Sequence, residues 1–87
     1  MSNQVISKSI IKLLGKKKFT LSVAESVTAG ALAAELTSIA GASKVFVGGV
    51  IAYSDEVKIS ELKVKKNDLS KHTSVSEQVA IAMAIGA

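Results

Sequence analysis

The chain has 87 residues, which is enough for one small domain and no more. It contains no Cys, which excludes disulfides, and its two Phe and one Tyr are too few to form a stacking platform for single-stranded nucleic acid. All eleven basic residues are Lys, and with seven acidic residues they give a net charge of +4. Because Arg is absent, the composition disfavours bidentate readout of guanine, and we do not expect a nucleic-acid partner.

The sequence also indicates where the protein is located and whether it binds a metal. The opening segment MSNQVISKSIIKLL lacks the long apolar run of a signal peptide, and no stretch is long enough to span a bilayer. We therefore expect a cytoplasmic protein with no membrane partner. With a single His, His72, and no Cys, we expect no metal site.

The first half of the chain predicts a helix, a strand and a second helix. Apolar residues recur at helical spacing over residues 3–17, which indicates an amphipathic helix that ends near a run of Lys. FTLSVAE, residues 19–25, alternates as a strand does. Ser26 is placed to cap a helix over residues 28–39.

The middle of the chain predicts a second strand followed by a short helix. Residues 45–54, VFVGGVIAYS, form a nearly continuous apolar run, which is typical of a strand covered on both faces. Gly48 and Gly49 mark a bulge or a close approach of other backbone. Ser54 caps a helix that runs through Leu62.

The last part predicts a polar loop or short helix over residues 63–72 and a final helix over residues 79–87. Ser74–Glu77 fits a capping box for that helix, which is apolar on nearly every face. The alternation of helix and strand predicts the α/β class, as a layered α/β/α sandwich. Two strands make an incomplete sheet, so we expect an incomplete domain that forms a homo-oligomer or lacks a C-terminal half.

Glu25–Gly30, ESVTAG, is the first group of residues that could carry chemistry. It places the hydroxyls of Ser26 and Thr28 beyond the C-terminal end of a strand, where open α/β sheets bind ligands. A helix N-terminus there favours an anion, and Gly30 would let a ligand approach the backbone. The alternative is that Ser and Thr only cap the helix.

Ser43, Tyr53 and Lys58 form the second group. Ser43 lies in a turn before the second strand, Tyr53 near its end, and Lys58 in the first turns of the next helix. A Lys at that helix end opposes the helix dipole, which disfavours the ammonium form and suits a general base for a Ser nucleophile. The alternative is a surface Lys that pairs with Asp55 or Glu56.

Three segments together resemble a known family. They are VAESVTAG (23–30), IAGASKVFVGGVIAYSDEVK (39–58) and HTSVSEQVAIAMAIGA (72–87). They are similar to the pattern A-E-S-C-T-G-G, then G-S-S-x-x-F-x-x-G-x-x-x-Y-S-N-E-x-K, then H-G-A-V-S-E. This is the pattern of the C-terminal domain of CinA, the competence/damage-inducible protein, a family that includes nicotinamide mononucleotide deamidases. The resemblance runs from Leu21 onward and covers about the first half of the family's domain.

The resemblance implies a Ser/Lys amidohydrolase that converts the carboxamide of nicotinamide mononucleotide to a carboxylate and releases ammonia. It implies no metal and no cofactor. Carried over by position, Ser43 is the nucleophile and Lys58 its base, with Tyr53 nearby. Ser26 is the rival nucleophile. The remaining implied site residues, which would bind the nucleotide, are Glu25, Thr28 and Gly30.

Five departures from the family pattern leave these groups in place. Val27 replaces Cys, Ala29 a Gly, Ala42 a Ser, Asp55 an Asn, and Thr73–Ser74 a Gly-Ala pair. The alternative to a deamidase is a non-catalytic relative that keeps the fold for ligand binding or assembly. A third hypothesis, a Lys-rich module that contacts nucleic acid, has only the calculated isoelectric point of about 9.5 and the family's name to support it.

Overall fold

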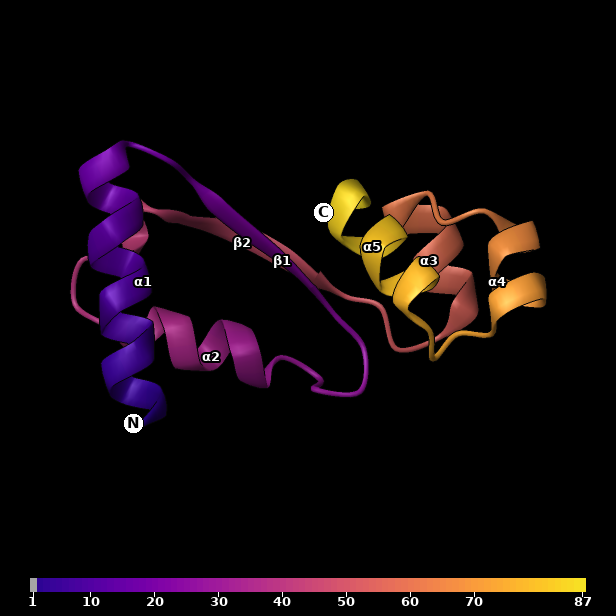
Figure 1. Ribbon diagram of the computed structural model, residues 1–87, viewed down its shortest axis with the longest axis horizontal. Helices are drawn as coiled ribbons and strands as arrows, with labels where there is room; N and C mark the ends of the chain where they lie inside the picture. Colours follow the sequence, from indigo (N-terminus) through magenta and orange to yellow (C-terminus); the bar gives the residue numbers. More distant parts are fainter. Residues whose placement is uncertain (1) are drawn as a thin grey trace.

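The computed structural model describes residues 2–87 as helices on either side of a short parallel sheet (Figure 1). In chain order its elements are α1 (Asn3–Lys17), β1 (Leu21–Glu25), α2 (Ala31–Thr37), the 3-10 helix η1 (Ala42–Lys44), β2 (Phe46–Ile51), α3 (Asp55–Leu62), α4 (Lys66–His72) and α5 (Glu77–Gly86). The predicted α/β class is confirmed. No helix within residues 2–87 is long and apolar enough to cross a membrane.

The two strands are parallel neighbours, and one residue bulges out of the ladder. Leu21 pairs with Phe46 and Ser22 with Gly48, so the register shifts between them. A Cβ on Gly49 would lie 2.7 Å from the carbonyl oxygen of Val23, closer than side chains approach. Both features predicted for the Gly pair, a bulge and a close approach, are therefore present.

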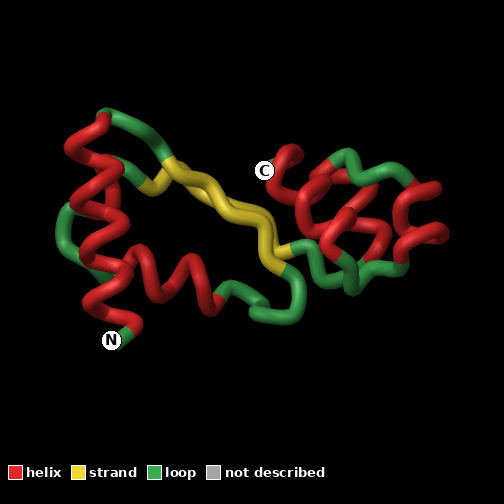
Figure 2. Tube along the Cα trace, in the orientation of Figure 1, coloured by secondary structure: helices red, strands yellow, loops and turns green. Residues whose placement is uncertain are grey.

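The strands link two groups of helices, one with α1 and α2 and one with α3, α4 and α5 (Figures 1 and 2). The described chain is accordingly elongated, with extents of 39 × 25 × 17 Å. Each group has its own apolar cluster. The first has Ile11, Ala42 and Val45 at its centre, and the second has Ala52, Leu62, Val64, Val79 and Met83.

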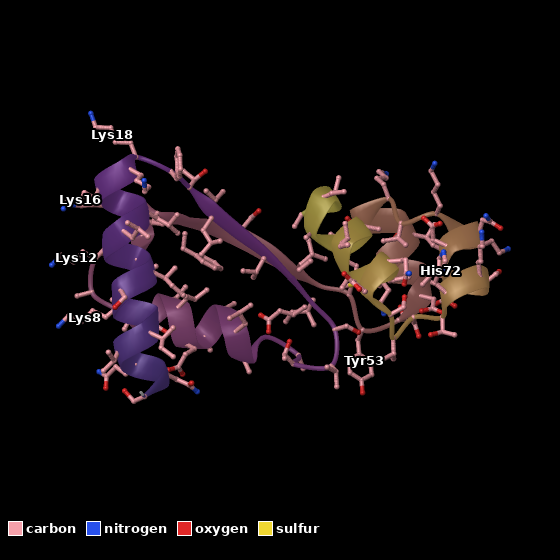
Figure 3. The ribbon with its side chains drawn as sticks, viewed as in Figure 1. Lys8, Lys12, Lys16, Lys18, Tyr53 and His72 are labelled. Carbon is pink, nitrogen blue, oxygen red and sulfur yellow. The ribbon has the colours of Figure 1, made fainter. Side chains whose placement is uncertain are left out.

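Helix α1 has the predicted bounds, but its buried side is narrow. Ile11 is buried, whereas Val5 and Leu13 are each 52% exposed. Lys8, Lys12 and Lys16 project from the side of α1 that faces away from the strands (Figure 3). The apolar spacing thus predicted the helix correctly without showing which side packs.

Three predicted details differ in the structure. Helix α2 begins at Ala31 after Gly30, so Ser26 does not cap it. Ser76, rather than Ser74, caps α5 through its Oγ, which accepts from the Val79 N–H at 3.3 Å. Strand β2 is not covered on both faces, because Val47 remains 72% exposed. The predicted Ser54 cap of α3 is present, and its Oγ accepts from the Val57 N–H at 3.2 Å.

Two glycines give a matched test of this packing. Gly49→Ala should lower the free energy of unfolding by about 1–3 kcal/mol, because its methyl group has no room against Val23. Gly15→Ala should raise it by about 0.5–1 kcal/mol, because Gly15 lies in a helix and its methyl would meet Val45 at 3.7 Å, an ordinary contact. Urea unfolding of both variants checks this. Equal effects would show that the strand contact is not tight.

Candidate active site

The site forms where the C-terminal ends of the two parallel strands meet. Glu25 pairs with Ile51 in the last step of the ladder, and the Ala52 N–H donates to the Glu25 carbonyl at 2.7 Å. This bond joins the two strands at the last residues before each strand leaves the sheet. Ser26 on one side and Tyr53 on the other therefore start from neighbouring positions.

Lys58 brings a third element to this point. It lies one turn into α3, and helical side chains lean toward the N-terminus of their helix, here toward the strand ends. Its Nζ donates to Ser26 Oγ at 3.2 Å and to the Tyr53 carbonyl at 3.4 Å. Its only ion pair within residues 2–87 is with the Asp55 carboxylate, at 3.8 Å.

The burial of Lys58 is unusual for so small a core. The residue is 2% exposed and is among the largest fully buried side chains of the described chain, whereas the Asp55 side chain is 58% exposed. A buried amino group gains little from a solvated carboxylate at that distance, and taking it out of water costs free energy. Core packing alone would favour an apolar residue here, so packing does not account for Lys at this position.

Glu25 is the second buried charge, and its partners are backbone N–H groups. Its Oε1 accepts from Gly30 at 3.2 Å and from Leu32 at 2.9 Å, and its Oε2 accepts from Ala33 at 2.9 Å. Glu25 thus occupies the N-terminus of α2, where sequence reasoning placed a ligand anion. At 3% exposure, it is a support beneath the loop rather than an open binding group.

These contacts set the ionisation of Glu25. Burial raises its pKa, but hydrogen bonds from the Ala33 N–H, the Thr28 hydroxyl and the N–H groups of Leu32 and Gly30 together outweigh burial. The net result is a pKa below the ordinary value of 4.5. The group is therefore a carboxylate at neutral pH.

The loop between Ser26 and α2 requires two residues with positive φ. Gly30 has φ 101°, a conformation that L side chains rarely adopt, and a Cβ there would meet Ile51 at 3.0 Å. Ala29 has φ 52° at the position where the family pattern has Gly. Gly30 is thus needed for the turn itself, which is a different role from the ligand approach expected of it.

A cavity of about 280 Å³ opens beside Ser26. Its lining joins the loop after β1 to the start of α5, and the residues are Ala24, Glu25, Ser26, Val27, Thr28, Ser74, Val75, Ser76, Ala80 and Met83. Thr28 lines it as expected. Sequence reasoning missed Ser74, Ser76 and Met83 as cavity residues, because it assigned the two serines to helix capping and Met83 to the final apolar helix.

Ser43 does not lie with these residues. It belongs to η1, before β2, whereas Lys58 follows β2, so a strand of about 20 Å lies between them. The cavity at Ser43 is lined by Thr37, Ile39, Gly41, Ala42, Ser43 and Phe46, which include no base. The structure therefore brings Lys58 together with Ser26 and not with Ser43.

Tyr53 contacts Lys58 through its backbone. Its carbonyl accepts from Nζ, while the residue as a whole is 71% exposed (Figure 3). Among residues 2–87, no three His, Asp or Glu side chains lie close enough to hold a metal ion.

Comparison with known proteins identifies the family of the chain. The model of the CinA C-terminal domain matches residues 3–87. The chain belongs to the CinA C-terminal domain family. A CinA-like protein of Kosmotoga olearia is 45% identical over 86 residues, which are 99% of this chain and 21% of that protein. A putative competence-damage inducible protein of Halothermothrix orenii is 51% identical over 75 residues, or 86% of this chain and 18% of that protein.

Solved CinA structures share the fold. A competence/damage inducible protein of Agrobacterium tumefaciens superimposes with a TM-score of 0.94 at 35% identity, covering 100% of this chain and 56% of that one. The competence damage-inducible protein A of Klebsiella pneumoniae gives 0.95 at 31% identity, covering 99% and 53%. The chain thus spans about a fifth of these curated relatives and about half of these solved chains.

Replacing Lys58 separates a chemical role from a structural one. Lys58→Met should leave the free energy of unfolding within about 1 kcal/mol of the parent, or raise it, because Met fills similar volume without a buried amino group. Leu62→Ala, also buried on α3, should lose about 2–5 kcal/mol. Thermal and urea unfolding measure both variants. A loss from Lys58→Met as large as that from Leu62→Ala would make Lys58 a structural residue.

Glu25 gives stability a pH dependence of known sign. Because its folded pKa is depressed, its contribution is fully present above the unfolded value of 4.5 and is lost as the pH falls through the folded pKa. At neutral pH, Glu25→Gln should therefore lower the free energy of unfolding by about 1–3 kcal/mol. The gap should close in acid, where both side chains are neutral. Urea midpoints across the acid range measure it, and a constant gap would contradict the assignment.

Proposed function

We propose that Ser26 and Lys58 are the nucleophile and base of a serine amidohydrolase of the nicotinamide mononucleotide deamidase type. The observation that supports this is the contact of 3.2 Å between Lys58 Nζ and Ser26 Oγ, with Lys58 buried beneath a partly exposed Ser26. A nucleophile within hydrogen-bond reach of its base is the defining feature of such sites. The amidohydrolase class and the substrate are those that the sequence resemblance to the deamidases of this family implies.

The chemistry follows from the two groups. In the proposed reaction, the Lys58 amine takes the proton of the Ser26 hydroxyl as Oγ bonds to the carboxamide carbon, which gives a tetrahedral oxyanion. The C–N bond then breaks, the nitrogen takes the proton from Lys58, and ammonia leaves an acyl ester on Ser26. Water, deprotonated by Lys58, attacks the ester, and the carboxylate departs as the Ser26 hydroxyl is restored.

The surroundings of Ser26 fit a small amide. The oxyanion would form beside the exposed turn Val27–Thr28, whose backbone N–H groups follow Ser26 directly in the chain. The cavity of about 280 Å³ presents hydroxyls from Thr28, Ser74 and Ser76 beside apolar Met83. That volume is at the small end of ligand sites, so the carboxamide ring would enter and the remaining nucleotide would stay outside.

Two serines provide a matched pair for the test. Ser26→Ala should abolish ammonia release from nicotinamide mononucleotide, and Ser43→Ala should keep most of it, because only Ser26 contacts Lys58. Lys58→Arg should be inactive, since Arg cannot accept a proton. Tyr53→Phe should cost less than about 10-fold, because the carbonyl that contacts Lys58 remains.

The same assays run on this chain and on a full-length relative judge the alternatives. Activity lost with Ser43→Ala and retained with Ser26→Ala would make Ser43 the nucleophile. A non-catalytic CinA-like domain for ligand binding or assembly is the second hypothesis, because the chain spans about half of the solved relatives. Binding of the nucleotide without ammonia release by either protein would support it.

A further inference from the structure

We infer that Glu25 is the positioning residue of the nucleophile: its buried carboxylate fixes the loop that carries Ser26 and so sets the approach of Ser26 Oγ to Lys58 Nζ. This inference rests on the proposed function. It assigns Glu25 a role that acts through Ser26, in place of the substrate contact expected from the sequence.

The loop is fastened at both ends by the same residue. The backbone carbonyl of Glu25 accepts from Ala52 at 2.7 Å, which ties the start of the loop to β2. The side chain of Glu25 accepts from Gly30, Leu32 and Ala33, which ties the end of the loop to α2. The four residues between, 26–29, therefore span two points that cannot move independently.

The burial of Glu25 argues for a role through the backbone rather than through contact of its carboxylate with substrate. Both carboxylate oxygens are occupied by N–H donors, and the residue is 3% exposed. No ion pair joins Glu25 to a cation among residues 2–87, so no direct contact links its carboxylate to Lys58. What Glu25 controls is backbone position, and a displacement of about 1 Å at a reacting atom can cost on the order of 100-fold in rate.

Glu25→Gln is a sharp probe because it keeps the size of the side chain. An amide has one acceptor oxygen, so its NH₂ group must face N–H donors at one of the two ends of the carboxylate. The donors of Gly30 and Leu32 lie at one end and that of Ala33 at the other. In either orientation the loop must shift away from its present position.

The first measurement is the rate at which a small sulfonyl fluoride labels Ser26, located by mass spectrometry. Ser26 Oγ bonds to sulfur, fluoride leaves, and Lys58 takes the proton, so the rate reports the geometry of the pair without substrate. Glu25→Gln should label about 10–100-fold more slowly at a temperature where circular dichroism shows it folded. Glu61→Gln, which removes an exposed carboxylate from α3, should label within about 2-fold of the parent.

The outcomes separate the inference from the proposed function. Parent-like labelling of folded Glu25→Gln would overturn the inference and leave the Ser26–Lys58 proposal intact. A parent that labels at Ser43, or at no serine, would overturn the proposed function and, with it, the positioning role. In an active full-length relative, the same substitution should lower kcat by a larger factor than it raises KM, because positioning acts on the reaction rather than on binding. Steady-state kinetics measure both constants.

Amide hydrogen exchange gives a second, independent measurement. Glu25→Gln should speed exchange at the amides of Gly30, Leu32 and Ala33, because these three N–H groups donate to Glu25, and should leave the amides of α5 as in the parent. Unchanged exchange at those three amides would show that the carboxylate does not hold the loop, whatever the labelling rate.

Discussion

The parallel pairing of β1 with β2 is the constraint on which the site depends. Parallel strands point their carboxyl ends the same way, so residues that follow them collect at one edge even when they are far apart in sequence. Ser26 and Lys58 are 32 positions apart and still come within hydrogen-bond distance. The hydrogen bond from the Ala52 N–H to the Glu25 carbonyl extends the pairing of the two strands to Glu25, the last residue before the loop.

Two buried ionisable groups are unusual in so small a core. Glu25 offsets its desolvation through three backbone N–H groups, which are fixed donors that water would otherwise satisfy. Lys58 has weaker compensation, with a hydroxyl, a carbonyl and a solvated carboxylate. The first group stabilises the loop, whereas the contacts of the second offset its burial less completely.

Local patterns in the sequence were sufficient for most elements. The spacing of apolar residues predicted α1 with its observed bounds, and Ser54 before two acids predicted the cap of α3. The start of α2 could not be predicted locally, because the group that satisfies its N–H donors is Glu25, eight positions before Ala33. A Ser before a helical pattern looks like a cap when the true cap comes from the preceding strand.

The pairing of Lys58 with one of the two serines is decided by topology rather than by sequence distance. Ser43 and Lys58 lie closer in sequence than Ser26 and Lys58, and position in the family pattern alone favoured them. A residue before a strand and a residue after the same strand, however, lie at opposite ends of the sheet. Strand direction therefore determines which residues can meet, and the two predicted strands already contained that information.

The site has a part that this chain supplies and a part that it leaves open. The contact between Ser26 and Lys58 involves only β1, α3 and the strand ends, which the described chain contains whole.

The sheet, in contrast, is not covered within the described chain. Val47 and Ile51 on β2 stay more than half exposed, and the described sheet has two strands, whereas parallel sheets are normally covered on both faces. The solved relatives have about as much chain again. Under the proposed function, reactivity of Ser26 would be a local property, whereas turnover of a whole nucleotide would also depend on surfaces outside the cavity of about 280 Å³. A chain that labels at Ser26 without releasing ammonia would fit this division, since the nucleophile would be formed while the binding of the rest of the substrate was not.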